Sequence, residues 1–73
     1  MTYAIEQRLR MIDFLLANYG SVAPKQLVDF FGISKPQASV DFRMYNSRAP
    51  GNMIYLHATL CWYTTASFKR VYP

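Results

Sequence analysis

The chain has very little of the chemistry that metal sites, disulfides and membrane spans require. It holds one cysteine, Cys61, and one histidine, His57, among 73 residues. A lone cysteine cannot form an intramolecular disulfide, and one Cys with one His is too small a set for zinc. No apolar run approaches the roughly 20 residues of a membrane span, and Met1 is not followed by a charged and then apolar leader. We expect a soluble, cytoplasmic protein without a metal and without a membrane partner.

Residues that work together in catalysis are missing too. The sequence has no nucleophile with an accompanying base and acid, no paired carboxylates and no glycine-rich phosphate loop. His57 falls in a turn, where a histidine is most often solvated or close to a phosphate. Cys61 falls in a strand, where it packs as a small hydrophobe. We expect neither an enzyme nor a cofactor.

Acidic residues are scarce, and their distribution is uneven. The chain has eight Lys and Arg against four Asp and Glu, which gives a net charge of +4. Charges cancel within residues 1–41, whereas residues 42–73 contain no acid and four cations: Arg43, Arg48, Lys69 and Arg70. A half of the chain whose charged residues are all positive suits a polyanion such as nucleic acid, although small basic proteins also use net charge to stay soluble. Charge alone does not decide between these two interpretations.

Apolar residues, by contrast, are abundant. They make up 52% of the chain and include five Phe, six Tyr and one Trp. A chain of this length forms a single domain over residues 1–73, and it buries only about 60% of the surface that the unfolded chain exposes. Some apolar side chains must therefore face outward or contact a partner.

The first helix is predicted over Thr2–Asn18, and Gly20 ends it. Apolar residues at helical spacing define its core stripe: Ile5, Leu9, Ile12, Leu16 and Tyr19. The residues that fall away from this stripe are expected to face solvent: Glu6, Arg10, Asp13 and Ala17. Glu6 and Arg10 also form a favourable i,i+4 pair.

Two shorter helices follow. Pro24 fits the first position of the second helix, and Gly32 supplies the left-handed conformation that ends it. Its inward residues are expected to be Leu27, Phe30 and Phe31. Ser34 is a good N-cap for the third helix, with Gln37 three residues later as its capping-box partner. The buried stripe of the third helix is expected to be Ala38, Phe42 and Tyr45.

The last third of the chain predicts a β-hairpin. Residues 49–52 form a breaker cluster, after which 53–56 and 61–64 have strong strand composition. Residues 57–60 are short enough to join them in a hairpin that opposes Tyr55 to Trp62. The fold class is therefore mostly α with a C-terminal hairpin, in the order of a winged helix-turn-helix: three helices and a wing.

The segment from Pro24 to Tyr45 has the spacing of a helix-turn-helix, which places its second helix in the major groove of DNA. The residues opposite the buried stripe of that helix are Pro36, Ser39, Val40, Arg43 and Ser47, with Gln37 and Met44 at the flanks. Arg43 is expected to read guanine, and Gln37 either to read adenine or to be occupied as a cap.

The remaining contacts divide between apolar groups and phosphates. Pro36 and Val40 can offer only apolar contact, for instance to a thymine methyl group. Lys35, Ser39 and Lys69 suit phosphates, with help at the first two from the helix N-terminus. Met44 is expected to pack within the protein. For each exposed residue the alternative interpretation is a solvated helix face.

At these positions the sequence resembles a known family. Gly32-Ile33-Ser34-Lys35-Pro36-Gln37-Ala38-Ser39, Tyr45, Ala49-Pro50-Gly51-Asn52, Tyr55, Trp62 and Phe68-Lys69 are similar to the N-terminal winged helix of bacterial WYL-domain transcriptional regulators, some of which repress phage-defence loci. The resemblance covers residues 8 to 70. It implies a repressor or autoregulator in the bacterial cytoplasm that binds an inverted repeat in double-stranded DNA as a homodimer.

The sequence departs from that family in three respects. The sequence stops at Pro73, without the WYL domain of the family, which fits either a small phage or mobile-element regulator that kept only the DNA-reading domain or an isolated domain cut from a longer chain. Val40 stands where family members often carry a basic residue. The wing tip, residues 57–60, has no Arg or Lys, so little contact between wing and DNA is expected.

Leftover apolar residues predict an interaction surface. Tyr3, Met11 and Phe14 project away from the core stripe of the first helix. The second face of the hairpin is apolar as well, and it holds Ile54, Leu56, Cys61 and Tyr63. We expect one of these faces to build a homodimer. The alternative for the hairpin is that the C-terminal residues Phe68, Val71 and Tyr72 fold back over it.

A second function fits the same observations. The modest net charge, the wing tip without Arg or Lys and the apolar residues left outside the core are also typical of a protein-binding module. The alternative is therefore a phage-encoded winged helix that binds and inhibits a host protein or defence complex.

Overall fold

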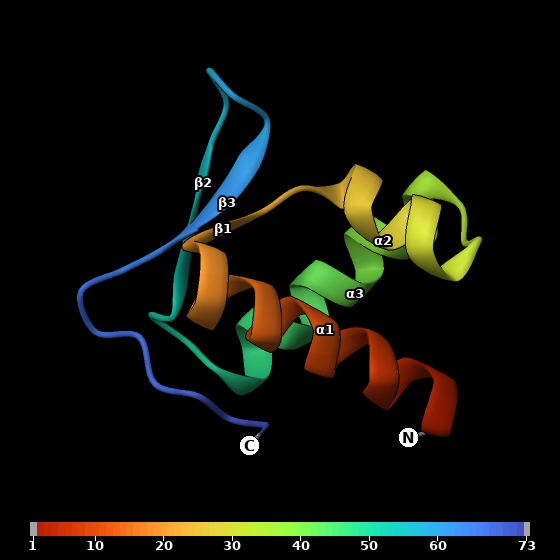
Figure 1. Cartoon of the computed structure of the whole chain (residues 1–73), viewed down its shortest axis with the longest axis horizontal. Helices are drawn as coiled ribbons and strands as arrows, with labels where there is room; N and C mark the ends of the chain where they lie inside the picture. The colour runs from red at the N-terminus through yellow and green to blue at the C-terminus, as the bar shows by residue number, and fades with distance from the viewer. Residues whose placement is uncertain (1, 73) are drawn as a thin grey trace.

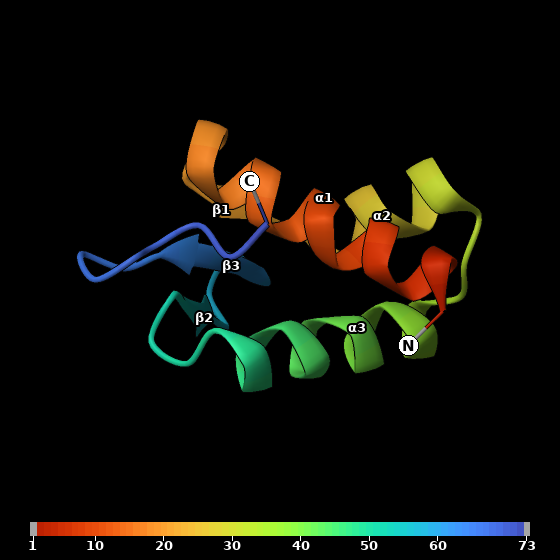
Figure 2. The same ribbon diagram turned by 90° about the horizontal axis from the view of Figure 1, so that it is seen from below.

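The computed structural model describes residues 2–72, and this part of the chain forms three helices and a three-stranded antiparallel sheet (Figure 1). The elements are α1 (Tyr3–Tyr19), β1 (Ser21–Val22), α2 (Pro24–Phe31), α3 (Lys35–Arg48), β2 (Met53–Leu56) and β3 (Cys61–Thr64). Figure 2 shows α1 and α2 on one side of the molecule, α3 on the other and the sheet at one end. The predicted winged-helix order is confirmed. No helix among residues 2–72 combines the length and the apolar character needed to cross a membrane.

The helix ends follow local chemistry. Ser34 Oγ accepts a hydrogen bond from Gln37 N (3.2 Å), as expected of an N-cap, and Gly32 ends α2 in the left-handed conformation with φ 67°. The predicted capping-box role of the Gln37 side chain is wrong, because its amide donates to Asp41 instead. The reach-back interaction occurs one helix earlier, where Gln26 Oε1 accepts from Ala23 N (2.7 Å).

The sheet is larger by one strand than the sequence predicts. Strand β3 lies in the centre and pairs with β2 on one side and with the two-residue β1 on the other. Tyr55 stands opposite Trp62, as predicted. Because side chains alternate between the two faces of a strand, Ile54 and Tyr63 share the outer face while Met53 is buried against the helices.

The core lies between the helices and the inner face of the sheet. Its most buried apolar residues are Leu9, Ile12, Leu16, Val22, Leu27, Ala38, Phe42 and Tyr45. Two residues predicted to be inward are exposed: Tyr19 (72%) and Phe30 (70%). Tyr19 is the last residue of α1, where the chain turns away at Gly20. Leu27 and Phe31 define the inward face of α2, and Phe30 lies about 100° from Phe31 and about 60° from Leu27 around the helix, on the solvent side of both.

The C-terminal segment packs against α1 and α3 and not over the hairpin. Tyr72 is buried, and its hydroxyl accepts a hydrogen bond from Arg48 at the end of α3 (3.1 Å). Phe68 packs against the same core, whereas Val71 is exposed. The alternative in which this segment covers the hairpin is wrong, and Ile54 (54%) stays exposed.

The correction at Phe30 can be tested within one helix. Leu27→Ala should lower the free energy of unfolding by about 2–5 kcal/mol, because it leaves a cavity in the core. Phe30→Ala should cost about 1 kcal/mol or less, since it removes an exposed ring whose contact is the edge of Phe31. Urea unfolding followed by circular dichroism measures both. Equal losses for the two variants would mean that Phe30 is part of the core.

Candidate nucleic-acid interface

The outward side of α3 is free of the protein's own chain. Ala38, Phe42 and Tyr45 are at most 1% exposed, so the prediction that they face inward is confirmed. The opposite residues are all exposed: Lys35, Pro36, Ser39, Val40, Arg43 and Ser47. Figure 2 shows α3 as the lower layer, with no other element beneath it. An exposed helix of this kind has the shape that enters a major groove.

The uncompensated positive charge of the molecule gathers at this helix. Within residues 2–72 each of the four acids pairs with a cation: Arg8 with Asp41, Arg10 with Glu6, Lys25 with Asp29 and Arg70 with Asp13. The four cations that have no acidic partner in this part of the chain are Lys35, Arg43, Arg48 and Lys69. Three of them belong to α3, and Arg48 was not singled out from the sequence.

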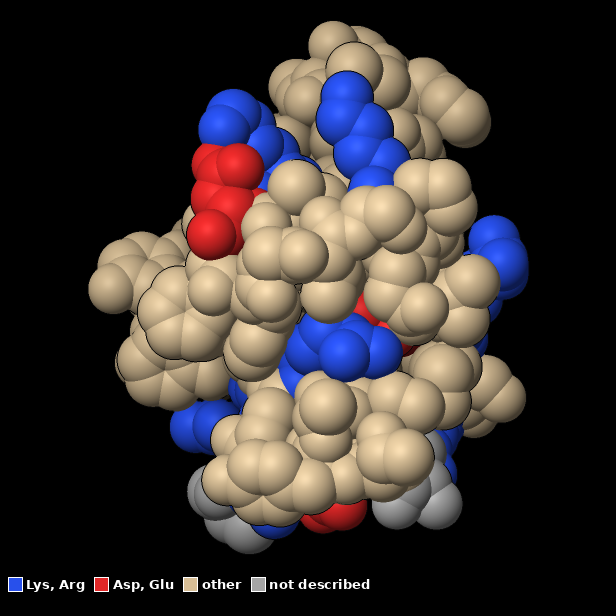
Figure 3. Space-filling view, turned by 90° about the vertical axis from the view of Figure 1, so that its right-hand side faces the viewer, with Lys and Arg blue, Asp and Glu red and all other residues tan. Residues whose placement is uncertain are grey.

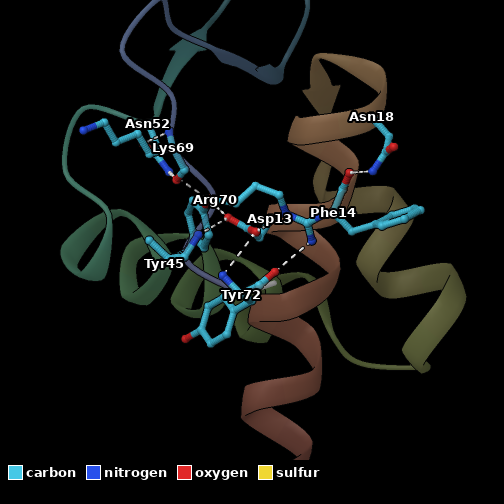
Figure 4. Close-up of polar contacts among 9 residues, drawn as sticks. Asp13, Phe14, Asn18, Tyr45, Asn52, Lys69, Arg70 and Tyr72 are labelled. Carbon is cyan, nitrogen blue, oxygen red and sulfur yellow. Dashed lines mark hydrogen bonds and ion pairs between the residues drawn. The ribbon is translucent and has the colours of Figure 1, made fainter.

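These cations are spread along the helix rather than gathered at one point. Lys35 begins α3, whereas Lys69 lies beyond its far end, where Asn52 binds both the N–H (3.0 Å) and the C=O (2.7 Å) of Lys69 (Figure 4). A 14-residue helix is about 20 Å long, so Lys35 and Lys69 do not form one cluster. Figure 3 shows Lys and Arg at several separate places on one side of the molecule, some of them beside Asp or Glu. Spaced cations suit successive phosphates of a backbone.

Aromatic contacts hold the wing against α3. Trp62 stacks on Phe42 with ring centroids 5.8 Å apart, and Tyr55 packs beside Trp62 at 5.1 Å. Ser39 and Arg43 line a groove of about 270 Å³ between α3 and these rings. Its neighbour, of about 360 Å³, is lined by Lys25, Lys35 and residues of the wing turn. The wing tip has no Lys or Arg, but Lys35 at the start of α3 places a positive charge beside it.

A buried ion pair fixes the first half of α3 to α1. The Asp41 carboxylate is fully buried, and it accepts from Arg8 Nε (2.6 Å) and from Arg8 Nη2 (3.3 Å). Gln37 Nε2 donates to the same carboxylate (3.0 Å). Because a buried charge is costly unless it is paired, this contact sets how α3 is rotated about its axis.

A second buried carboxylate fixes the other half of α3. Asp13 is fully buried, and it accepts from Tyr45 Oη (2.6 Å), Arg70 Nε (3.0 Å) and the backbone N–H groups of Val71 (3.2 Å) and Tyr72 (3.3 Å) (Figure 4). Burial, together with the hydrogen bond to Asp13, raises the pKa of the Tyr45 hydroxyl well above its usual range. The hydroxyl therefore remains a donor.

The sequence-based placement of Asp13 on the solvent side of α1 is wrong. The residue lies on the margin of the buried stripe, next to Ile12 and one turn from Leu9 and Leu16. Asp41 likewise lies between Ala38 and Tyr45, inside the buried stripe of α3. The helical phase of both acids signals their burial, although it does not reveal their partners.

Apolar residues predicted to contact a partner fall into two separate places. Met11 and Phe14 line a groove of about 530 Å³ between α1 and α2, together with Leu15, Tyr19 and Phe30. Tyr3 is exposed at the start of α1 and does not line this groove. Ile54 and Tyr63 lie side by side on the outer face of the sheet.

Comparison with known families agrees with this geometry. A sequence model described as the BrxR transcriptional regulator winged helix-turn-helix domain matches residues 4–72. The chain belongs to this family. The resemblance to the winged helix of WYL-domain transcriptional regulators, inferred from the motifs around Gly32 and Ala49, is thereby confirmed.

Curated relatives carry the name DNA-binding transcriptional repressor CapW. The one from Pseudomonas aeruginosa is 43% identical over 68 residues, which cover 93% of this chain and 23% of the relative. The one from Escherichia coli (strain KTE188) is 42% identical over 67 residues, covering 92% and 22%. The one from Stenotrophomonas maltophilia is 35% identical over 65 residues, covering 89% and 22%. This BrxR-family chain thus spans less than a quarter of the length of these relatives.

The role of Asp13 in this BrxR-family domain can be tested by a matched pair of substitutions. Asp13→Asn should lower the free energy of unfolding by about 3 kcal/mol or more. The substitution breaks the buried ion pair with Arg70 and places an amide NH₂ group against groups that are themselves hydrogen-bond donors. Asp29→Asn removes an exposed i,i+4 partner of Lys25 and should change stability by less than about 1 kcal/mol. Chemical unfolding curves compare the two. Similar small effects would contradict the proposed network.

Proposed function

We propose that this domain binds a specific site in duplex DNA through α3 and acts as a transcriptional repressor in the bacterial cytoplasm. The observation that carries the proposal is the position of the cations without acidic partners within residues 2–72, which lie on or beside α3, a helix whose outward side is exposed from Lys35 to Arg48. Such charges attract a polyanion, and a free helix fits its major groove. The names of the relatives, DNA-binding transcriptional repressor, support the same function.

Most exposed residues of α3 have an assigned contact. Arg43 projects from the middle of the outward side and is assigned to guanine. Val40 and Pro36 lie about one and two turns before it on the same side of the helix and offer apolar contact. Lys35 and Ser39, in the first half of the helix, are assigned to phosphates, as are Ser47 and Lys69 near its far end. Arg48 joins this second group because it has no acidic partner within residues 2–72.

Arg43→Ala tests the orientation of α3. The variant should bind a site selected from random DNA about 1–3 kcal/mol more weakly, and it should lose discrimination at one base pair. Fluorescence anisotropy with the selected duplex and its single-base variants measures both effects. Unchanged affinity for the selected site would contradict the proposed orientation.

Lys35→Ala and Arg10→Ala serve as controls for that experiment. Lys35→Ala should weaken binding evenly across sequences and lower the slope of affinity against salt by about one. Arg10 lies on α1, where it pairs with Glu6 and stands over the Tyr72 ring, so its removal should leave affinity for DNA nearly unchanged.

A homodimer on an inverted repeat forms the second part of the proposal. Two copies joined at the α1–α2 groove would point their α3 helices in opposite directions, because α1 and α2 form the layer opposite α3 (Figure 2). The outer face of the sheet lies at the end of the molecule instead. A two-fold axis there turns both recognition helices to the same side, as an inverted repeat requires. We therefore assign the dimer contact to Ile54, Leu56 and Tyr63.

Sedimentation tests this assignment. The domain at tens of micromolar should show a species of twice the 8.5 kDa chain mass, and Ile54→Lys should abolish it by placing a charge in an apolar contact. Phe14→Lys in the α1–α2 groove should leave the dimer intact. A monomer alone, or loss of the dimer with Phe14→Lys only, would contradict the assignment.

A further inference from the structure

Gln37 occupies an unusual position for a side chain at the start of a recognition helix. It is the third residue of α3 and half-buried, and its Nε2 donates to the fully buried carboxylate of Asp41 (3.0 Å). Asp41 is itself held by two hydrogen bonds from Arg8. The amide of Gln37 therefore belongs to a fixed chain of contacts that begins on α1.

This contact determines which way the amide faces. A carboxylate can only accept hydrogen bonds, so the amide must turn its nitrogen, and not its oxygen, toward Asp41. The remaining oxygen, Oε1, has no hydrogen-bond partner among residues 2–72. No buried side-chain oxygen or nitrogen in this part of the chain lacks a partner, so Oε1 is open to solvent. Gln37 thus presents an acceptor at the surface, beside Lys35 and Pro36.

We infer that Asp41 locks the Gln37 amide so that α3 selects a base that presents an amino group in the major groove, adenine or cytosine, at one position of its site. In the major groove adenine and cytosine present an amino donor, whereas the edges of guanine and thymine carry only acceptors and a methyl group. A free glutamine can turn its amide over and donate to the acceptors of guanine. A locked one faces them with its own oxygen, which is repulsive.

The inference rests on the proposed function, because it requires α3 to lie in the major groove. It goes further in two respects. It gives Gln37 a preference for amino over keto bases, and it makes Asp41, with Arg8 behind it, a positioning residue that acts through Gln37. Neither Asp41 nor Arg8 needs to touch DNA.

The experiment measures affinity for the selected site and for all its single-base variants. Gln37→Ala identifies the base pair that Gln37 contacts, as the one where discrimination disappears. At that position the intact domain should prefer adenine or cytosine over guanine or thymine by about five- to 150-fold. Replacing a preferred adenine by purine, which lacks the amino group, should remove most of that preference. A preference for guanine or thymine there would overturn the inference.

Asp41→Asn tests the lock itself. Asparagine can donate as well as accept, so the Gln37 amide is free to turn, and the ratio of affinities for adenine and guanine variants should fall by about fivefold or more. A purely structural role would weaken all sequences equally and leave this ratio unchanged, which would overturn the lock. If the variant does not fold, the affinities of the intact domain for adenine, purine and guanine at that position still test the lock, because a free glutamine would donate to guanine and bind it better than purine, whereas a locked one would not.

Failure of this inference is distinguishable from failure of the proposed function. If Arg43→Ala relaxes specificity at its own base pair while Gln37→Ala changes none, α3 reads DNA and the role of Gln37 is wrong. If the intact domain discriminates between no sequences at all, the proposed function is wrong.

Discussion

Two buried carboxylates, one on α1 and one on α3, each bind a side chain of the other helix. The direction in which α3 turns its exposed side depends on these contacts. Arg8 of α1 holds Asp41 of α3, and Asp13 of α1 accepts from Tyr45 of α3. Apolar contacts are not directional, so Ala38 and Phe42 alone would tolerate some rotation of the helix. Hydrogen bonds to buried charges at two places along α3 do not tolerate such rotation, because it would take Asp41 away from Arg8 and Tyr45 away from Asp13.

The same acids also determine the charge of the surface. Each of the four acids pairs with a cation from α1, α2 or the C-terminal segment, and none pairs with Lys35, Arg43 or Arg48 of α3. The fold therefore neutralises Arg8, Arg10, Lys25 and Arg70 and leaves the cations of α3, with Lys69 beyond its end, without an acidic partner among residues 2–72. Because Asp41 of α3 is buried, all charged residues on the exposed side of this helix are positive.

Periodicity, caps and turn residues were enough to predict the helices, the hairpin and its register, because these depend on neighbours within a few residues. Strand β1 was missed because two residues carry no alternation. Phe30 was misplaced because α2 is too short for hydrophobicity to define its face. The partners of Asp13 lie 32 to 59 residues away, so no local pattern could reveal them. For the same reason the orientation of Gln37 could not be predicted without Asp41 and Arg8.

The small number of unpaired cations constrains how the domain can bind DNA. The three unpaired cations assigned to phosphates, Lys35, Arg48 and Lys69, give a logarithmic salt slope of about −2.7, so the attraction of one copy to DNA of any sequence is weak at physiological salt. The uncharged wing adds little to it. Base contacts in the groove can add affinity, and in the proposed dimer a second copy on the same duplex would double both the phosphate contacts and the bases read. A wing without Lys or Arg and an apolar outer sheet face are consistent with each other under that proposal, because the sheet would contribute to binding by pairing two recognition helices rather than by touching DNA.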